Sequence, residues 1–371
     1  MTGSEVAYQR LGQKTAQNRF RHFPRYFPQA YKTDDIRVAI NAEIPALGYR
    51  TYVVRQGVDK APTRHPQRPG LSTAAGCLEN EFIKVAAQSN GSITLTDKRN
   101  GQVYDRLLTF EDIADIGDGW FHGMAVNDQA FYSLAASSHI ALVHDGPLIA
   151  SLRIRTVMEV PQKFQFDTMT RSESFAPLVL DSLITLRKEA DYLDIRTTVD
   201  NQIDDHRVRV LFPSGVQAQT YLCDTPFDVV ERAIAIDPQN HTYRELEVET
   251  RPQQSWSAVF ADQRGLAVIS SGLLESTVCD LQDRAIALTL YRSTQRTVFT
   301  NGEPLGQLHG RMEFRYRVMP LQGAPSRRAL CELGQELAAG IANVQINREE
   351  QVRFTSERYL PETAGAFRVE G

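Results

Sequence analysis

The sequence lacks any apolar run approaching the ~20 residues that a membrane span needs, and its start, MTGSEVAYQRLGQK, has no apolar signal core. It has only four cysteines, Cys77, Cys223, Cys279 and Cys331, and no C-x-x-C pair. This spacing indicates buried thiols rather than a disulfide framework or a zinc knot. The net charge of −4 argues against nucleic acid as a partner, because phosphate neutralisation needs concentrated Lys and Arg. We therefore expect a cytoplasmic protein with no membrane or nucleic-acid partner.

The usual short motifs of enzymatic sites are also missing. The eight histidines form neither H-E-x-x-H nor H-x-H, so the sequence predicts no metal site in this chain. It contains no G-x-S-x-G, no P-loop and no G-x-G-x-x-G. These absences exclude the hydrolase elbow, the phosphate-binding loop of NTPases and the dinucleotide fingerprint.

Alternating strand patterns are what the chain does contain. Segments 78–88, 92–98 and 102–108 are joined by Asn90-Gly91 and Asn100-Gly101. Asn-Gly supplies the two positive-φ residues of a tight hairpin turn, which predicts a three-stranded antiparallel meander. The meander leads into FEDIADIGDGWFHG, where Asp and Gly surround Trp120. That loop is either a solvated, glycine-rich turn or a contact loop on a β-scaffold.

Strand patterns continue to about residue 323 with almost no helical periodicity, which predicts a large antiparallel β-sandwich. The exception is a helix over 326–344, with Ser326 as N-cap, laid on the sheet edge. Its apolar face comprises Ala329, Leu330, Leu333, Leu337 and Ile341. The predicted organisation is a partial β-domain (1–55), a Pro- and Gly-rich linker (56–75), the sandwich (76–325), and a helix with a lead-in to a missing last domain (326–371). Both ends look cut, so we expect a segment of a larger protein.

Three groups of residues are candidates for chemistry. Glu111, Asp112, Asp115 and Asp118 are close enough in sequence to supply paired carboxyls, although such clusters are more often solubilising turns. Residues 204–207, Asp-Asp-His-Arg, form either a site or a charged hairpin tip that closes Asp205 on Arg207 or Arg209, and the hairpin tip is the favoured interpretation. Arg292 ends the apolar strand AIALTLY, where it forms a surface ion pair or reaches a ligand hydroxyl or carboxylate.

The segment 18–32, NRFRHFPRYFPQAYK, mixes aromatic and basic residues. In isolation it could stack on single-stranded nucleic acid. A strand edge or a connection packed on a neighbouring domain is the favoured interpretation, because the rest of the chain offers no basic groove.

Nine segments, taken in order, resemble the C-terminal β-region of glycoside hydrolase family 38, the zinc-dependent retaining α-mannosidases and bacterial mannosylglycerate hydrolases. They are IPALGYRTY (44–52), LENEFIKV (78–85), GSITLTDKRNGQVYDRLLTFED (91–112), DIGDGW (115–120), TTVDNQIDDHRVRVLFPSG (197–215), DTPFDVVER (224–232), GLAVISSGL (265–273), LTLYRS (288–293) and GRMEFRYRVMP (310–320).

The resemblance implies an all-β fold, a large antiparallel supersandwich of the galactose-mutarotase type after a smaller partial β-domain. It also implies that the zinc and the nucleophile belong to an N-terminal catalytic domain whose signatures do not occur here. No catalytic residue can be carried over, and the chain alone is expected to be inactive. Its implied partners are its own catalytic domain and a mannoside or mannosylglycerate-like carbohydrate; a homo-oligomer is left open.

The resemblance also implies which residues of this chain lie at the rim of the sugar pocket. The loop matching 115–123 faces the sugar cavity in the family, which makes Asp118, Trp120, Phe121 and His122 candidate substrate contacts. The family usually has an acidic residue and Tyr here, followed by a proline-containing turn, so DGWFHGMAV departs from its pattern. Arg292 is the further candidate, from its match in LTLYRS.

Two alternatives remain. One is a stand-alone carbohydrate-binding or assembly module. The other is a mutarotase-like sugar enzyme, which would need His122, His206 and either Glu111 or Glu313 to converge on one sheet face.

Overall fold

The computed structural model describes residues 6–45, 48–53, 70–117, 123–244, 246–297 and 306–343. It divides into two compact units, one formed by 1–69, 146–148 and 341–371, the other by 70–145 and 149–340. The predicted domain bounds stay a prediction, since most of the linker and of the final segment lies outside the described residues.

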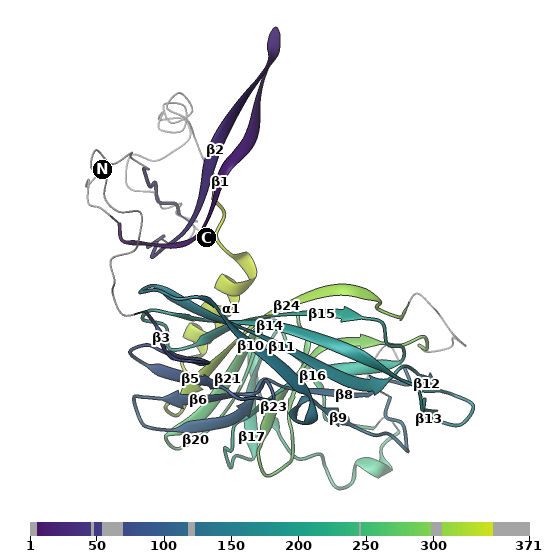
Figure 1. Ribbon diagram of the computed structural model, residues 1–371. Helices are drawn as coiled ribbons and strands as arrows, with labels where there is room; N and C mark the ends of the chain where they lie inside the picture. The colour runs from purple at the N-terminus through teal and green to yellow at the C-terminus, as the bar shows by residue number, and fades with distance from the viewer. Residues whose placement is uncertain are drawn as a thin grey trace. The chain divides into compact units, whose positions relative to one another are not determined.

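The larger unit consists of antiparallel sheets stacked in layers (Figure 1). A nine-stranded sheet has the order β10 (Ser137–His144), β11 (Ile149–Pro161), β14 (Phe175–Arg187), β15 (Leu193–Asn201), β24 (Gly310–Leu321), β21 (Arg264–Ser271), β20 (Trp256–Ala261), β17 (Thr220–Thr225) and β18 (Asp228–Ala233). A six-stranded sheet has the order β19 (Arg251–Pro252), β22 (Glu275–Val278), β23 (Ala285–Ser293), β16 (His206–Pro213), β8 (Thr109–Ala114) and β9 (Phe131–Tyr132).

A five-stranded sheet runs through β3 (Ser72–Ala74), β4 (Cys77–Glu79), β5 (Ile83–Ala87), β6 (Ile93–Asp97) and β7 (Val103–Leu107). The smaller elements are the ribbon β12 (Phe164–Gln165)–β13 (Thr170–Arg171) and the 3₁₀ turns η1 (Ser133–Ala135) and η2 (Asn240–Thr242). One hydrophobic core joins the three large sheets, with Phe212 of β16 and Tyr316 of β24 in edge-to-face contact at 5.9 Å. The predicted all-β antiparallel sandwich is confirmed.

The predicted meander is present, but segment 78–88 is divided into the paired strands β4 and β5, so β4 to β7 are four strands instead of three. Its turns also differ from the expected type. Gly91 and Gly101 have positive φ, whereas neither Asn90 nor Asn100 does. The loops are longer, closed by the amide of Gly91 donating to the carbonyl of Gln88 at 2.9 Å and that of Gly101 to Asp97 at 2.8 Å. The left-handed position therefore falls on glycine, where it costs least.

The predicted helix is α1 (Arg327–Ala339), and it is shorter than expected. Ser326 caps it by accepting the amide of Ala329 at 3.3 Å. It ends at Gly340, whose φ of +64° is outside the helical region, so Ile341 is 66% exposed and not on the apolar face. Leu330 packs with residues of β20 and β21, which places the helix on the face of the nine-stranded sheet and not on its edge.

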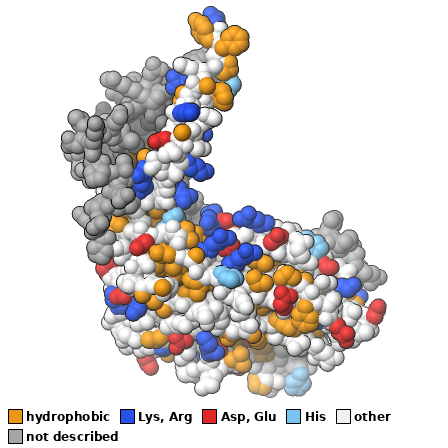
Figure 2. Space-filling view, in the orientation of Figure 1, with side chains coloured by type: hydrophobic (Ala, Val, Ile, Leu, Met, Phe, Trp, Pro, Cys, Tyr) orange, Lys and Arg blue, Asp and Glu red, His pale blue; other side chains and the backbone are white. Residues whose placement is uncertain are grey.

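In the smaller unit, β1 (Tyr8–Phe23) and β2 (Tyr26–Ile40) form one long antiparallel hairpin that turns between Phe23 and Tyr26. The segment 18–32 is therefore the tip of a hairpin and not a connection between two strands. Phe20, Tyr26 and Phe27 are exposed at 63%, 79% and 95%. Figure 2 shows hydrophobic side chains gathered at this tip with basic ones near them.

Candidate functional site

The loop that follows β8 is described at its base. The amide of Gly123 donates to the carbonyl of Gly117 at 3.0 Å, and that of Ile116 donates back to Gly123 at 3.4 Å. Gly117 has a φ of +99°, and a Cβ on it would lie 2.4 Å from the carbonyl oxygen of Arg296. The loop thus leaves and rejoins the body at one tightly packed point. The candidates Asp118, Trp120, Phe121 and His122 lie outside the described residues, and their roles stay a prediction.

Arg292 and Asp115 form the strongest contact at this base. The guanidinium donates through Nε at 2.6 Å and through Nη2 at 3.1 Å to the two carboxylate oxygens. Asp115 is fully buried, and the Arg292 side chain is 15% exposed. Burial lowers the pKa of Arg292, but hydrogen bonding to Asp115 outweighs it and the pKa is raised. The predicted candidate Arg292 is therefore placed directly beneath the loop, as a largely buried ion pair.

Asp205 ties two further segments to the same base. Its carboxylate accepts the backbone amide of Gln295 at 3.0 Å and the side-chain amide of Gln307 at 2.9 Å. Its own carbonyl accepts the amide of Asp115 at 2.9 Å. Burial raises the pKa of Asp205 despite these donors. The expectation that Asp205 pairs with Arg207 or Arg209 is wrong, because the carboxylate lies among amide donors.

The three described acids of the predicted quartet each have a separate arginine. Glu111 pairs with Arg209 at 2.6 Å, Asp112 with Arg171 at 2.5 Å, and Asp115 with Arg292. Glu111 and Asp112 are neighbours on β8, so their side chains lie on opposite faces of the sheet. Paired carboxyls for acid–base chemistry need a shared, accessible space. These acids have instead become buried structural charges.

The imidazole of His206 is likewise held by buried side chains. Its Nδ1 lies 2.5 Å from Asp112 and its Nε2 3.0 Å from the Asn201 side-chain oxygen, and all three side chains are buried. Glu111 lies on the other face of β8, and Glu313 is on β24, where it contacts Arg315 at 3.2 Å. Among the described residues, His206 therefore converges with neither glutamate, as a mutarotase-like site would require.

A buried arginine adjoins this network. Arg207 is 4% exposed, and its Nη1 donates to the hydroxyl of Thr250 at 3.1 Å. Burial, together with the charge of Arg209, lowers the pKa of Arg207 to about 10. Its two preceding neighbours, Asp205 and His206, are buried as well.

Sequence reasoning missed the aromatic patch beside the loop base. The Arg296 guanidinium lies 3.6 Å from the ring centre of Phe166, which is in edge contact with Phe164 at 5.1 Å. Ala114, Ile116 and the two phenylalanines belong to one small apolar cluster. The alternation in Lys-Phe-Gln-Phe at 163–166 indicates a strand, but it does not show which other part of the chain the two phenylalanine rings contact.

The described residues do not fit a zinc ion. No group of three or more His, Cys, Asp or Glu side chains in this part of the chain is arranged to hold a metal. The four cysteines are all free, with Cys223 and Cys279 buried and Cys77 and Cys331 partly exposed. No helix within the described ranges is long and apolar enough to cross a membrane.

Comparison with known proteins agrees with the resemblance read from the sequence. The curated protein "Putative mannosylglycerate hydrolase" of Halalkalibacterium halodurans is 26% identical over 275 residues, 69% of this chain and 29% of that protein. The solved α-mannosidase of Enterococcus faecalis V583 superposes with a TM-score of 0.77 at 27% identity, over 90% of this chain and 38% of that one. A second Enterococcus faecalis structure, a protein in the glycosyl hydrolase family 38, gives a TM-score of 0.72 at 25% identity, over 90% and 39% of the two chains.

This chain thus spans less than half the length of each of these relatives. Residues 78–297 match the model of the glycosyl hydrolases family 38 C-terminal domain, a stretch that runs from β4 past the Asp115–Arg292 pair. The match covers more than half of the chain and includes the loop base described above. The chain belongs to the family of the glycosyl hydrolases family 38 C-terminal domain.

Proposed function

We propose that this chain is the C-terminal β-region of an α-mannosidase-type glycoside hydrolase, where it supports a catalytic domain and contributes loop 115–123 to the rim of the sugar pocket. The observation that carries the proposal is the family match across the loop base. The buried Asp115–Arg292 pair supports it, because a rigid base lowers the entropic cost of holding a side chain against substrate.

In this proposal the chemistry itself lies outside the chain. By resemblance, a zinc-dependent retaining double displacement takes place in the catalytic domain, which would hold the zinc. Each of the described acids Glu111, Asp112 and Asp115 is bound to an arginine, which supports our proposal that this chain alone is inactive. The substrate is a mannoside or mannosylglycerate-like carbohydrate. A cytoplasmic location also remains our proposal, supported by the four free cysteines.

The test compares this chain with a form extended at its N-terminus by the upstream reading frame, using an aryl α-mannoside with and without a zinc chelator. Turnover by the long form alone, abolished by chelation, is expected. Turnover by this chain alone would refute the proposal. In the active form, Trp120→Ala should raise KM if the ring contacts the sugar. The buried Trp256 is kept in this variant, and its fluorescence shows whether the fold is intact.

For self-association we propose the tip of hairpin β1–β2 as the contact and a second copy of this chain as its partner. The tip segment 18–32 contains Arg19, Arg21, Arg25 and Lys32 and no acidic residue, while the whole chain has a net charge of −4. The remainder is therefore more negative still, which favours docking on another copy over nucleic acid. A two-stranded hairpin with both faces exposed is also marginal by itself.

A further inference from the structure

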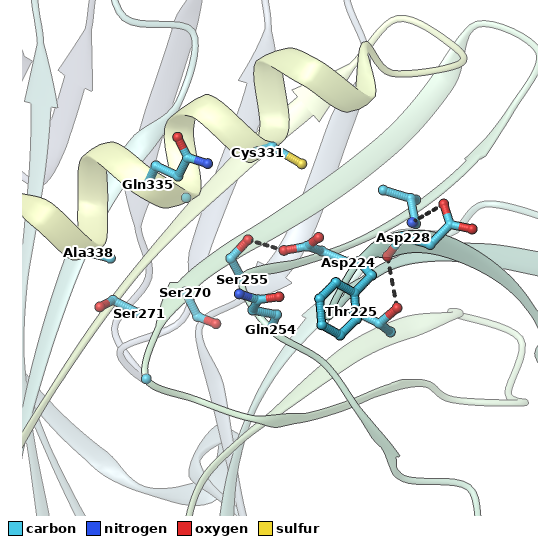
Figure 3. A pocket seen from close by; sticks show the side chains of 14 residues that line it. Asp224, Thr225, Asp228, Gln254, Ser255, Ser270, Ser271, Cys331, Gln335 and Ala338 are labelled. Carbon is cyan, nitrogen blue, oxygen red and sulfur yellow. Dashed lines mark hydrogen bonds between the residues drawn. The ribbon is translucent and has the colours of Figure 1, made fainter. Parts of the chain in front are cut away.

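A second site lies on the nine-stranded sheet, away in sequence from the loop base. It is a groove of about 480 Å³ between helix α1 and the ends of β17, β20 and β21 (Figure 3). This volume is within the range of small-molecule sites, about 300–1,000 Å³. Gly334 lets the helix approach closely, since a Cβ there would lie 2.7 Å from the hydroxyl of Ser255.

Contacts within the groove fix its polar wall. The hydroxyl of Ser255 donates to the carboxylate of Asp224, and the backbone amide of Gln254 donates to the backbone carbonyl of Asp224 at 2.8 Å. The Thr225 hydroxyl donates to the carbonyl of Asp228 at 2.8 Å. The Asp224 carboxylate is thus held by Ser255, the residue before β20, and the Asp228 carboxylate accepts the backbone amide of Val229 at 2.7 Å (Figure 3).

Three other polar side chains of the groove are exposed or partly exposed and are available to a ligand. Within the described residues, the side-chain amides of Gln254 and Gln335 and the hydroxyl of Ser271 make no hydrogen bond. All three residues line the groove, and Figure 3 shows them on three different elements around it. Amide and hydroxyl groups both donate and accept, so together with the carboxylates they match a ligand rich in hydroxyls.

An aromatic side chain completes the lining. Phe227 lies in the two-residue turn between β17 and β18, is fully exposed and has a φ of +77°. A bulky residue in that region is strained, and its ring joins none of the hydrophobic clusters of the described residues. Strain and exposure of this kind concentrate at sites of ligand contact. A free ring beside hydroxyl-binding groups can stack on the C–H face of a sugar.

The charges of the lining narrow the ligand class. Asp224 and Asp228 are acidic, and none of the described residues that line the groove is Lys, Arg or His. Phosphorylated or carboxylated ligands would meet uncompensated negative charge there. We propose that this groove binds a neutral saccharide, with Phe227 stacking on a pyranose ring and Asp224, Gln254 and Gln335 hydrogen-bonding its hydroxyls. This inference does not depend on the function proposed above, because the groove shares no residue with the loop base.

The test titrates the chain with methyl α-mannopyranoside, methyl α-glucopyranoside and mannose 6-phosphate, followed by calorimetry and ligand-observed NMR. At least one neutral glycoside should bind with a Kd on the order of 1 mM. The phosphate should bind at least tenfold more weakly than its neutral counterpart. Phe227→Ala and Asp224→Asn should each weaken binding by about tenfold, an amount equivalent to one stacking or charged contact. Leu281→Ala, which truncates an exposed apolar side chain that does not line the groove, is the matched control.

A variant that relieves the strain separates binding from folding. Phe227→Gly should lose binding while the melting temperature rises or stays constant, because glycine accepts a positive φ. A clear drop in melting temperature would instead mean that the ring serves the fold. The proposal is overturned by that result, by the absence of saturable binding of either neutral glycoside, by equal binding of the phosphate, or by wild-type affinity in Phe227→Ala.

Discussion

Removing Arg292 should cost this protein a large part of its stability. Arg292→Ala leaves the fully buried Asp115 carboxylate with the backbone amide of Gly117, at 3.0 Å, as its remaining hydrogen-bond donor among the residues that the structure describes. Breaking a buried pair by deleting one partner costs about 3–5 kcal/mol. At about 1.4 kcal/mol per factor of ten, the unfolding equilibrium should shift by between two and four powers of ten.

Urea unfolding followed by the fluorescence of the buried Trp256 measures this loss. Arg292→Lys keeps the charge but not the two-pronged geometry, so its effect should lie between those of wild type and alanine. Arg153→Ala is the control, since it breaks an exposed pair with Asp181 and should hardly move the midpoint. The double variant with Asp115→Asn should lose less than the sum of the single variants.

A local readout distinguishes anchoring of the loop from general stability. Limited proteolysis under native conditions should cut the loop between Gly117 and Gly123 faster in Arg292→Ala than in wild type or in Arg153→Ala, because its base is loosened. The reasoning is refuted if Arg292→Ala loses less than about 1 kcal/mol, or if the two single variants prove strictly additive.

Three further predictions concern a glycine of the loop base, a buried thiol and the hairpin tip. Gly117→Ala should lower the melting temperature more than Gly272→Ala, because both have positive φ but only Gly117 would meet a neighbouring carbonyl. Burial raises the pKa of Cys279 to about 12, so at pH 8 it stays a thiol and should react with a maleimide far more slowly than the partly exposed Cys331; equal rates would contradict its burial. Phe27→Ser should reduce the mass measured by light scattering if the hairpin tip joins two copies, and a wild-type monomer would disprove that contact.

The sequence predicted local structure well where one residue decides it. Alternation placed the strands, Gly91 and Gly101 marked the turns, and Ser326 marked the start of the helix. The helix end was missed although Gly340 carried the signal, since a glycine just past the last turn commonly stops a helix in the left-handed conformation. The turn between Phe23 and Tyr26 was missed because two long strands with both faces exposed have no hydrophobic alternation to reveal their pairing.

The candidate site was harder to predict because its contacts join residues far apart in the chain. Asp115 and Arg292 are separated by 177 positions, and nothing in either local pattern selects one for the other. Seen alone, the acids at 111–118 suggest a reactive cluster or a solvated turn. Only the folded structure shows that a cation is available at each described carboxylate, with Arg209 supplied by β16, Arg171 by β13 and Arg292 by β23.

These pairings give the acidic stretch an architectural role. Burying a carboxylate is expensive unless it is paired and hydrogen-bonded, so the three acid–arginine pairs tie β8 and the residue that follows it to β16, β13 and β23. A hydrophobic anchor could stabilise the same strands, but bidentate hydrogen bonds also fix direction. The base of the loop is therefore fixed in both position and direction, which our proposal requires if a side chain of the loop is to meet one face of a sugar.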